Sequence, residues 1–226
     1  MNQNLRLCTK VVPALLAVNL CLGIARGADL PPPVVERVCS GCHGIEGNYG
    51  WRQVPRLAGQ NAVYMEAQFQ AYRLAPTPPR AEIVTYFTPP TPPVEGARDD
   101  RDGVTFMVGI SKTLSEKESA DAAAWYASRQ PAPGTPGDPA LVVQGKELFE
   151  QGAPERGIPA CQGCHGPSGQ GNAQFPRIAG QYADYLQRQL RALQVGQRTH
   201  FPPMATISRE LTPDELRAVT EYVQSL

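Results

Sequence analysis

Apolar residues recur at helical spacing in several segments of this chain. In the segment before Gly196, which can end a helix, the recurring positions are Tyr182, Tyr185, Leu186, Gln189, Leu190 and Leu193. The related segment of about 61–74 has one such stripe, made of Tyr64, Ala67, Ala71 and Leu74. Because no segment shows the alternation of apolar and polar residues that strands need, the pattern predicts an all-α fold.

Two further helices are marked by the residues that begin them. Segments 115–118 and 212–215 are capping boxes, in which a hydroxyl residue and a glutamate three positions later satisfy the first backbone groups of a helix. The helices that follow are expected to bury Ala122, Trp125 and Tyr126 in one case, and Leu216, Val219 and Val223 in the other.

The two halves of the chain differ near their starts. In the second half, residues 141–149 predict a helix that places Gly145 and Phe149 against the last helix. In the first half, the segment 29–38 leaves little room for an equivalent helix because it holds three consecutive prolines.

The halves are two copies of one sequence pattern. The segments 55–60 and 176–181 read PRLAGQ and PRIAGQ, and they match at an offset of 121. Landmarks that return in the same order indicate an internal duplication. The other matched pairs are Cys39 with Cys161, Cys42 with Cys164, His43 with His165, Tyr64 with Tyr185, Gln68 with Gln189, Met107 with Met204, and Leu114 with Leu211.

Prolines and glycines indicate where the copies are joined and where they differ. The segment 130–139, QPAPGTPGDP, predicts a linker between a first domain of 28–129 and a second domain of 140–226. The first copy is 24 residues longer between Gln68 and Met107, as a Pro-rich insertion of about 76–100. We expect either a solvated loop or a docking surface for a redox partner there.

The first 27 residues predict a signal peptide. Arg6 and Lys10 precede an apolar run of 11–25, and small residues stand before position 28. We therefore expect secretion and cleavage, the alternative being an uncleaved anchor. No other segment is apolar enough to span a membrane. The mature chain would carry 18 basic against 21 acidic residues, a balance that argues against nucleic-acid binding.

Each copy contains the sequence C-x-x-C-H. Cysteines three positions apart lie on one face of a helical turn, where their sulfurs can bond the two vinyl groups of one haem. The histidine that follows then projects toward the iron. The pattern predicts two haem c groups per chain, attached through Cys39, Cys42, Cys161 and Cys164, with His43 and His165 as axial ligands.

Paired cysteines also serve three other chemistries. A redox dithiol of this spacing is typical of a βαβ context, which the pattern does not indicate. A zinc site needs two more ligands at compatible spacing, and neither half offers them. A disulfide explains the cysteines but not the histidine in both copies. Haem attachment explains all three residues twice.

The methionines supply candidates for the second axial ligand. Met107 and Met204 are equivalent, each seven residues before the leucine that precedes a capping box. His/Met ligation fills the iron's coordination positions and raises its reduction potential. Met65 is expected only to pack in the interior, because its counterpart in the second half is Leu186.

The CSGCH and CQGCH motifs, the paired PRLAGQ and PRIAGQ segments and the downstream methionines resemble the dihaem cytochromes c4, within the class I cytochromes c. The resemblance covers nearly the whole mature chain. It implies two tandem class I cytochrome c domains, each around one covalently bound haem c, with the haem propionates near the domain interface.

The resemblance also implies roles for residues between the motifs. Carbonyls of Pro55 and Pro176 are expected to accept the ring N–H of the two motif histidines. His200 is expected at the surface or near a propionate. The candidates for contacts to the propionates are Arg56 and Arg177, then Tyr64 and Tyr185 or Gln60 and Gln181, each with a turn or surface position as the alternative.

The function implied by the resemblance is electron transfer in the periplasm. The expected partners are a donor dehydrogenase or cytochrome complex and an acceptor oxidase, and the chain itself is expected to be no enzyme. One alternative is a cytochrome c subunit of a flavin- or quinone-linked oxidoreductase complex, such as a sulfide dehydrogenase. A dihaem enzyme, such as a thiosulfate dehydrogenase, is less favoured because the mature chain has no spare cysteine and one spare histidine.

Overall fold

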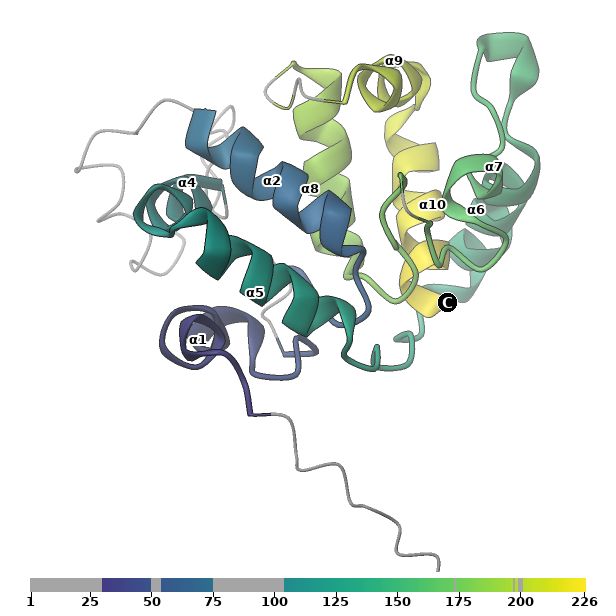
Figure 1. The fold of residues 1–226 in the computed structure, drawn as a ribbon. Helices are drawn as coiled ribbons and strands as arrows, with labels where there is room; N and C mark the ends of the chain where they lie inside the picture. The colour runs from purple at the N-terminus through teal and green to yellow at the C-terminus, as the bar shows by residue number, and fades with distance from the viewer. Residues whose placement is uncertain (1–29, 50–53, 75–103, 173, 197, 199–200) are drawn as a thin grey trace, which may run out of the picture. The chain divides into compact units, whose positions relative to one another are not determined.

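The computed structural model of the chain describes residues 30–49, 54–74, 104–172, 174–196, 198 and 201–226 (Figure 1). The predicted signal peptide of 1–27 and the Pro-rich insertion of 76–100 lie outside the described residues, as does His200. Both haem motifs, both candidate methionine ligands and the whole of the predicted linker are described.

Helices account for the regular structure of the described residues, where strands are represented only by an isolated bridge between Ala153 and Ile158. The all-α prediction is therefore confirmed. The first half contains η1 (Val35–Cys39), α1 (Ser40–His43), α2 (Ala62–Leu74), α4 (Val104–Thr113) and α5 (Glu116–Ala127). The second contains α6 (Pro139–Gln151), η4 (Pro154–Arg156), α7 (Gln162–His165), α8 (Ala183–Gln194), α9 (Pro202–Glu210) and α10 (Pro213–Ser225).

The duplication in the sequence is repeated in the hydrogen bonding. In the first half the Gly59 N–H donates to the Tyr126 carbonyl at 2.9 Å, and in the second the Gly180 N–H donates to the Val223 carbonyl at 2.9 Å. Both glycines have positive φ, of 66° and 68°, a conformation that costs glycine little. The PRLAGQ and PRIAGQ segments thus turn back onto the last helix of their own half in the same way.

Both predicted capping boxes form. The Ser115 hydroxyl accepts from the Glu118 N–H at 3.2 Å, and the Glu118 carboxylate accepts from the Ser115 N–H at 2.9 Å. Thr212 and Glu215 make the same two bonds at 3.2 and 2.9 Å. Because these bonds satisfy donors that a helix start leaves unpaired, they fix where α5 and α10 begin.

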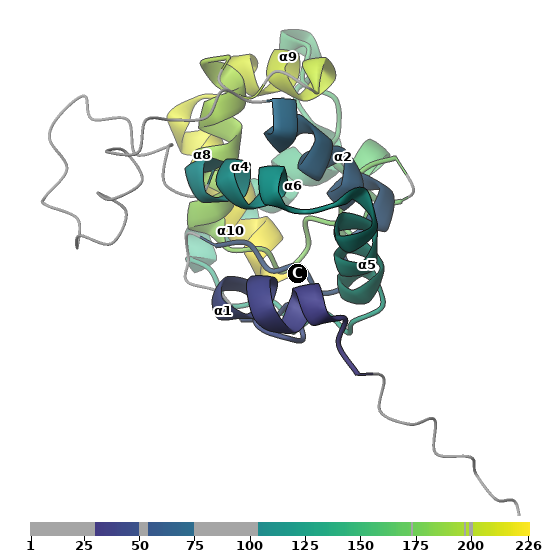
Figure 2. The same ribbon diagram turned by 60° about the vertical axis from the view of Figure 1, so that its left-hand side comes forward.

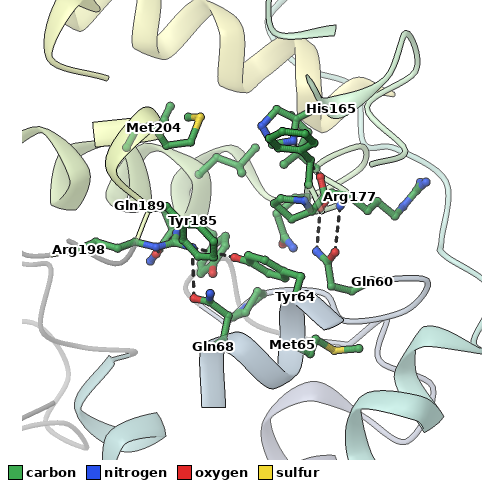
Figure 3. A pocket seen from close by; sticks show the side chains of 18 of the residues that line it. Gln60, Tyr64, Met65, Gln68, His165, Arg177, Tyr185, Gln189, Arg198 and Met204 are labelled. Atoms are coloured by element: carbon green, nitrogen blue, oxygen red, sulfur yellow. Dashed lines mark hydrogen bonds between the residues drawn. The ribbon is translucent and has the colours of Figure 1, made fainter. Parts of the chain in front are cut away.

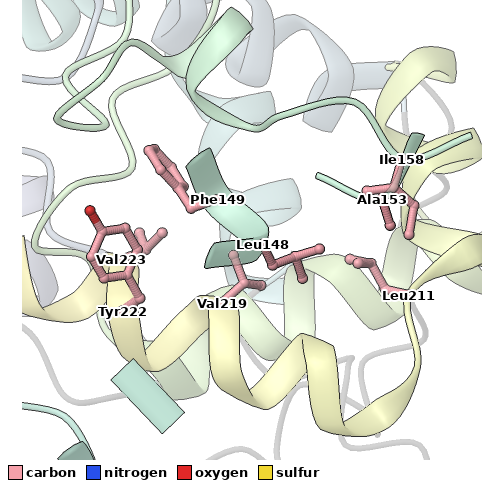
Figure 4. Packing of buried hydrophobic residues seen from close by; sticks show 8 residues of the cluster. All are labelled: Leu148, Phe149, Ala153, Ile158, Leu211, Val219, Tyr222 and Val223. Atoms are coloured by element: carbon pink, nitrogen blue, oxygen red, sulfur yellow. The ribbon is translucent and has the colours of Figure 1, made fainter. Parts of the chain in front are cut away.

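The core of the second half lies between α6 and α10 (Figure 4). The Phe149 and Tyr222 rings meet edge to face, with centroids 5.3 Å apart. Gly145 lets the helices approach closely, because a Cβ there would overlap the carbonyl oxygen of Ala218. The buried cluster consists of Leu148, Phe149, Ala153, Ile158, Leu211, Val219, Tyr222 and Val223.

The first half fills the corresponding space with less helix. A short helical segment, continued by η1 and α1, buries Val34 and Val35 against α5. A helix therefore does precede the first haem motif, and the expectation of little room is right only in that this helix is short. In both ribbon views α2 lies beside α4 and α5 (Figures 1 and 2). The buried cluster consists of Val34, Val35, Met65, Ala122, Ala123, Trp125 and Tyr126.

The stripe predicted for α2 is wrong in part. Ala67 is exposed and Leu74 is 86% exposed, whereas Met65 is buried and Phe69 packs against the core. The segment holds apolar residues on more than one face, so periodicity alone did not identify the buried one. Large side chains occupy the interior, and the alanines that defined the predicted stripe contribute little area to bury.

Of the described helices, none combines the length and the apolar character needed to cross a bilayer.

Candidate functional site

Each C-x-x-C-H motif forms a single helical turn that ends in a glycine. Gly44 and Gly166 follow the two histidines with φ of 72° and 82°. A side chain at Gly44 would also stand 2.7 Å from the Cβ of Tyr49. The glycines therefore let the chain reverse directly after each histidine, and the two cysteines stay on the helical turn that precedes it.

The two motif histidines are held in the same way. The Nδ1 atom of His43 lies 3.0 Å from the Pro55 carbonyl oxygen, and that of His165 lies 2.9 Å from the Pro176 carbonyl oxygen. Both expected contacts are thus confirmed. Because a carbonyl oxygen can only accept a hydrogen bond, Nδ1 carries the hydrogen and donates it, and the Nε2 atom of each ring is left as the nitrogen that can ligate a metal.

Burial keeps these imidazoles neutral. Each is 7% exposed, and loss of solvent lowers the pKa of both histidines, while the proline carbonyls oppose the shift. A neutral imidazole retains the lone pair that ligation requires. The proline carbonyls therefore orient the two rings as axial ligation needs, and burial favours the neutral form that can ligate.

The motif cysteines form no disulfide in either half. Burial, followed by the neighbouring cysteine, raises the pKa of the Cys39 and Cys161 thiols to about 11. Such thiols are not the low-pKa thiolates of a redox dithiol. Within the described residues no three Cys, His, Asp or Glu side chains converge as a metal cluster. The arrangement thus disfavours the dithiol and zinc interpretations on chemical grounds.

A large cavity connects the two motifs. Its volume is about 410 Å³, and its walls are mostly apolar side chains of both halves (Figure 3). The walls include the four cysteines, His43 and His165, and the two methionines, Met107 from α4 and Met204 from α9. Thiols, an imidazole and a thioether in apolar surroundings are the donor set of a His/Met haem c, so the residues present fit that group twice.

Met65 also borders this cavity but is 6% exposed and belongs to the core cluster of the first half. Its predicted role in packing is confirmed. Comparison of the two repeats therefore identified Met65 correctly as a packing residue, distinct from the equivalent pair Met107 and Met204.

Two glutamines join the halves by reciprocal bonds. Gln60 accepts from the Arg177 N–H at 2.9 Å and donates to the Arg177 carbonyl at 2.8 Å. Gln181 makes the same pair of bonds with the backbone of Arg56, at 3.0 and 2.9 Å. Since each arginine follows the proline that holds a motif histidine, this clasp connects the surroundings of the two histidines. Sequence reasoning had offered these glutamines only as propionate contacts.

The two arginines predicted to contact propionates lie in different surroundings. The Arg56 guanidinium donates to the Gly180 carbonyl at 2.7 Å and lies 4.5 Å from the centroid of the Tyr182 ring. Both arginines border the cavity, and burial lowers the pKa of Arg177. Arg56 thus has a structural role between the halves, and propionate binding by either arginine stays a prediction.

Sequence reasoning missed Arg198. It borders the cavity between α8 and α9, and its guanidinium contacts side chains of both halves. The available clue was weak: Arg198 is the one Lys or Arg between Leu193 and Met204, in a segment that precedes a predicted ligand.

Comparison with known proteins settles the family. A family model for cytochrome c matches residues 142–226. A cytochrome c4 from Azotobacter vinelandii is 34% identical over 223 residues, covering 94% of this chain and 98% of the relative. The chain belongs to the cytochrome c4 family. It is accordingly an electron-transfer cytochrome that binds two haem c groups covalently.

Two further relatives extend the comparison. The crystal structure of reduced recombinant cytochrome c4 from Pseudomonas stutzeri has a TM-score of 0.68 and 34% identity, covering 84% of this chain and 94% of that one. A thiosulfate dehydrogenase electron acceptor from Stutzerimonas stutzeri (strain A1501) is 35% identical, covering 81% of this chain and 76% of the relative. The predicted fold of class I cytochrome domains is confirmed by these matches.

Proposed function

We propose that this cytochrome c4 relative carries electrons in the periplasm through two haems, each ligated by one histidine and one methionine. Cys39 and Cys42 would attach the first haem, whose iron would be ligated by His43 and Met107. In the second half the corresponding residues are Cys161, Cys164, His165 and Met204. The observation that carries the proposal is that both histidines have their Nδ1 atoms engaged by a carbonyl while both methionines border the same cavity.

The residues around the cavity determine what such a site can do. A bound haem supplies one-electron exchange, and the apolar walls exclude water from its surroundings. A methionine and a histidine from the same chain leave no coordination position for a substrate. Fixed ligands also limit rearrangement when the charge changes. These properties suit a carrier better than an enzyme.

The periplasmic location is supported by the sequence of the first 27 residues and by the covalent haem motifs. Fractionation of the native host, followed by detection of haem-bearing protein, tests the location. Recovery of the haem-bearing protein in the periplasmic fraction is expected. Recovery in the membrane fraction, released only by detergent, would contradict a freely diffusing carrier.

Spectroscopy of the purified holoprotein tests the ligands. We expect two haems per chain by pyridine haemochrome assay and, in the oxidised protein, the weak near-infrared band of thioether–iron ligation with the intensity of two such haems. Half that intensity would leave one methionine unassigned. Absence of the band would reject the proposed ligand set while leaving the haem content unchanged.

A more specific role is electron acceptor of a thiosulfate-oxidising enzyme, as one relative is named. Stopped-flow mixing of the oxidised protein with a thiosulfate dehydrogenase and thiosulfate should reduce both haems within the enzyme's turnover time. The control omits the enzyme. Equal reduction with and without the enzyme would assign thiosulfate oxidation to this chain itself, as the enzyme alternative requires.

A further inference from the structure

Arg198 is a half-buried cation whose identified partners are neutral. Its Nη1 donates to Gln189 Oε1 at 2.9 Å, and its Nη2 donates to the Tyr64 hydroxyl at 2.8 Å and to Gln68 Oε1 at 3.2 Å. Its Nε is buried and has no hydrogen-bond partner. No carboxylate of the described residues pairs with it. Because a cation that is partly withdrawn from water is costly unless it is compensated, this position favours an anion.

The residues around Arg198 come in equivalent pairs from the two halves. Gln68 and Gln189 occupy the same position of the repeat, and both accept from its guanidinium. Tyr64 and Tyr185 are likewise equivalent, and both lie beside Arg198 in Figure 3. The offset between the repeats changes from 121 to 97 within this segment, so Arg198 aligns with Thr77 or with Arg101, and both positions lie outside the described residues. Among the described residues, the Arg198 guanidinium thus lies where matching side chains of both halves meet.

The cavity beside Arg198 indicates which anion it meets. Arg198 borders the same cavity as both C-x-x-C-H motifs. Each haem c carries two propionate carboxylates, and a guanidinium is the side chain best suited to hold a carboxylate in apolar surroundings. The Phe201 ring, 5.6 Å from the guanidinium carbon, covers another side of Arg198 and stacks on Tyr64. The Arg198 guanidinium is thus partly covered by Phe201 and borders the cavity that both haem motifs share.

We propose that Arg198 is the shared counter-ion for the propionates of both haems. The proposal rests on the proposed haem sites. A cation close to an iron favours the reduced state, because reduction removes one positive charge from the iron. A single shared arginine raises both reduction potentials together, so that the two haems respond as a pair to changes at one residue.

The test compares Arg198→Met with Arg191→Met in the holoprotein. Arg191 lies on the exposed face of α8, so its replacement changes the net charge equally without touching the cavity. We expect Arg198→Met to shift the reduction equilibrium of both haems about tenfold toward the oxidised form, which is about 59 mV for one electron. Arg191→Met should leave both potentials near those of the unmodified protein.

The second variant, Arg198→Lys, retains the charge and guards against a Met variant that does not fold. Lysine lacks the planar fork, so both potentials should fall in the same direction but by less. A fall at one haem alone would overturn the shared counter-ion, as would shifts no larger than those of Arg191→Met. Two haems with intact near-infrared bands in those variants would show that the proposed function stands even if this proposal fails.

Discussion

The two halves use different side chains to secure the same backbone groups. In the first half Arg73 on α2 donates to the carbonyls of Ser111 and Leu114 at 3.0 and 3.1 Å. In the second half Gln194 on α8 donates to the equivalent carbonyls of Ser208 and Leu211 at 2.7 and 3.0 Å. These carbonyls end the helix that carries the candidate methionine ligand. The duplicated architecture therefore preserves a hydrogen-bonding task while the residue that performs it changes.

The halves also differ in how they support the haem motif. In the second, Phe149 of α6 packs beneath α10. In the first, where the preceding helix is short, the Tyr126 hydroxyl donates to the Gly44 carbonyl at 3.0 Å and the Trp125 indole to the Ile45 carbonyl at 2.7 Å. Individual hydrogen bonds in the first half thus correspond to helix packing in the second, which makes each half sensitive to different substitutions.

The largest effect is expected when the candidate methionine ligand is removed from one half and then, in a second variant, from the other. Met107→Ala and Met204→Ala should each lower the reduction potential of one haem by about 120 mV, which shifts its reduction equilibrium on the order of a hundredfold toward the oxidised form. Redox titration of each variant measures this. Met65→Leu serves as the control and should leave both potentials unchanged, since Met65 packs in the core. Equal effects of all three substitutions would remove the distinction between ligand and packing residue.

Gly145→Ala is expected to disturb the packing of α6 against α10 in the second half. The added methyl group overlaps the Ala218 carbonyl, and overpacking of this kind costs about 1–3 kcal/mol of unfolding free energy. Thermal or urea unfolding followed by circular dichroism provides the value. In the first half, Gly109→Ala meets nothing within 4 Å and should be neutral or stabilise α4 by up to about 1 kcal/mol. A stable Gly145→Ala variant would show that α6 does not press on α10.

Arg73 and Gln194 occupy equivalent positions of the two halves, and their contributions are compared with the variants Arg73→Met and Gln194→Met. Arg73 also donates to the Ser119 hydroxyl at 2.6 Å, so its loss leaves more groups unpaired. We expect a cost of about 2–3 kcal/mol for Arg73→Met and about 1–1.5 kcal/mol for Gln194→Met. Urea unfolding of both variants decides the order. The reverse order would mean that the charged side chain contributes less than the amide it corresponds to.

The smallest expected effect concerns an ion pair found in one half. Arg156 pairs with Glu215 in the second capping box, and hydrogen bonding to Arg156 is the main reason that the pKa of Glu215 is lowered. The ionised Glu215 carboxylate therefore stabilises the folded protein at pH values above its ordinary pKa of 4.5. This stabilisation is lost as the pH falls through the lower pKa that Glu215 has in the folded protein.

Glu215→Gln tests that pair, because glutamine can still serve in the capping box. We expect a loss of about 0.5 kcal/mol at pH 7 that disappears at low pH. Glu118→Gln is the matched change in the first half, where the cap bonds remain and no arginine among the described residues pairs with the glutamate. Unfolding curves at several pH values separate the two, and identical pH profiles would mean that Arg156 adds nothing.

The sequence predicted what depends on local pattern. The capping boxes and the end of α8 near Gly196 follow from spacing within one repeat, the proline carbonyls under both histidines follow from the family resemblance, and all are confirmed. Contacts between the repeats were not predictable. Arg198 and the clasp of Gln60 and Gln181 join residues more than 110 positions apart, and no periodicity reports which side chains meet across an interface.

The misassigned face of α2 has the same origin. Alanines at helical spacing look like an apolar stripe, but Ala67 is exposed, and the core is filled by larger side chains such as Met65 and Phe69. Which of two possible stripes faces inward is decided by α4 and α5, which contact α2 from elsewhere in the chain.

Carbon monoxide binding to the reduced, unmodified holoprotein tests most directly whether both irons are ligated on both sides by this chain. We predict that the visible spectrum stays unchanged under carbon monoxide at neutral pH, and that Met107→Ala and Met204→Ala each bind one equivalent. Binding of carbon monoxide by the unmodified protein would reveal an open iron position and return a catalytic role to consideration.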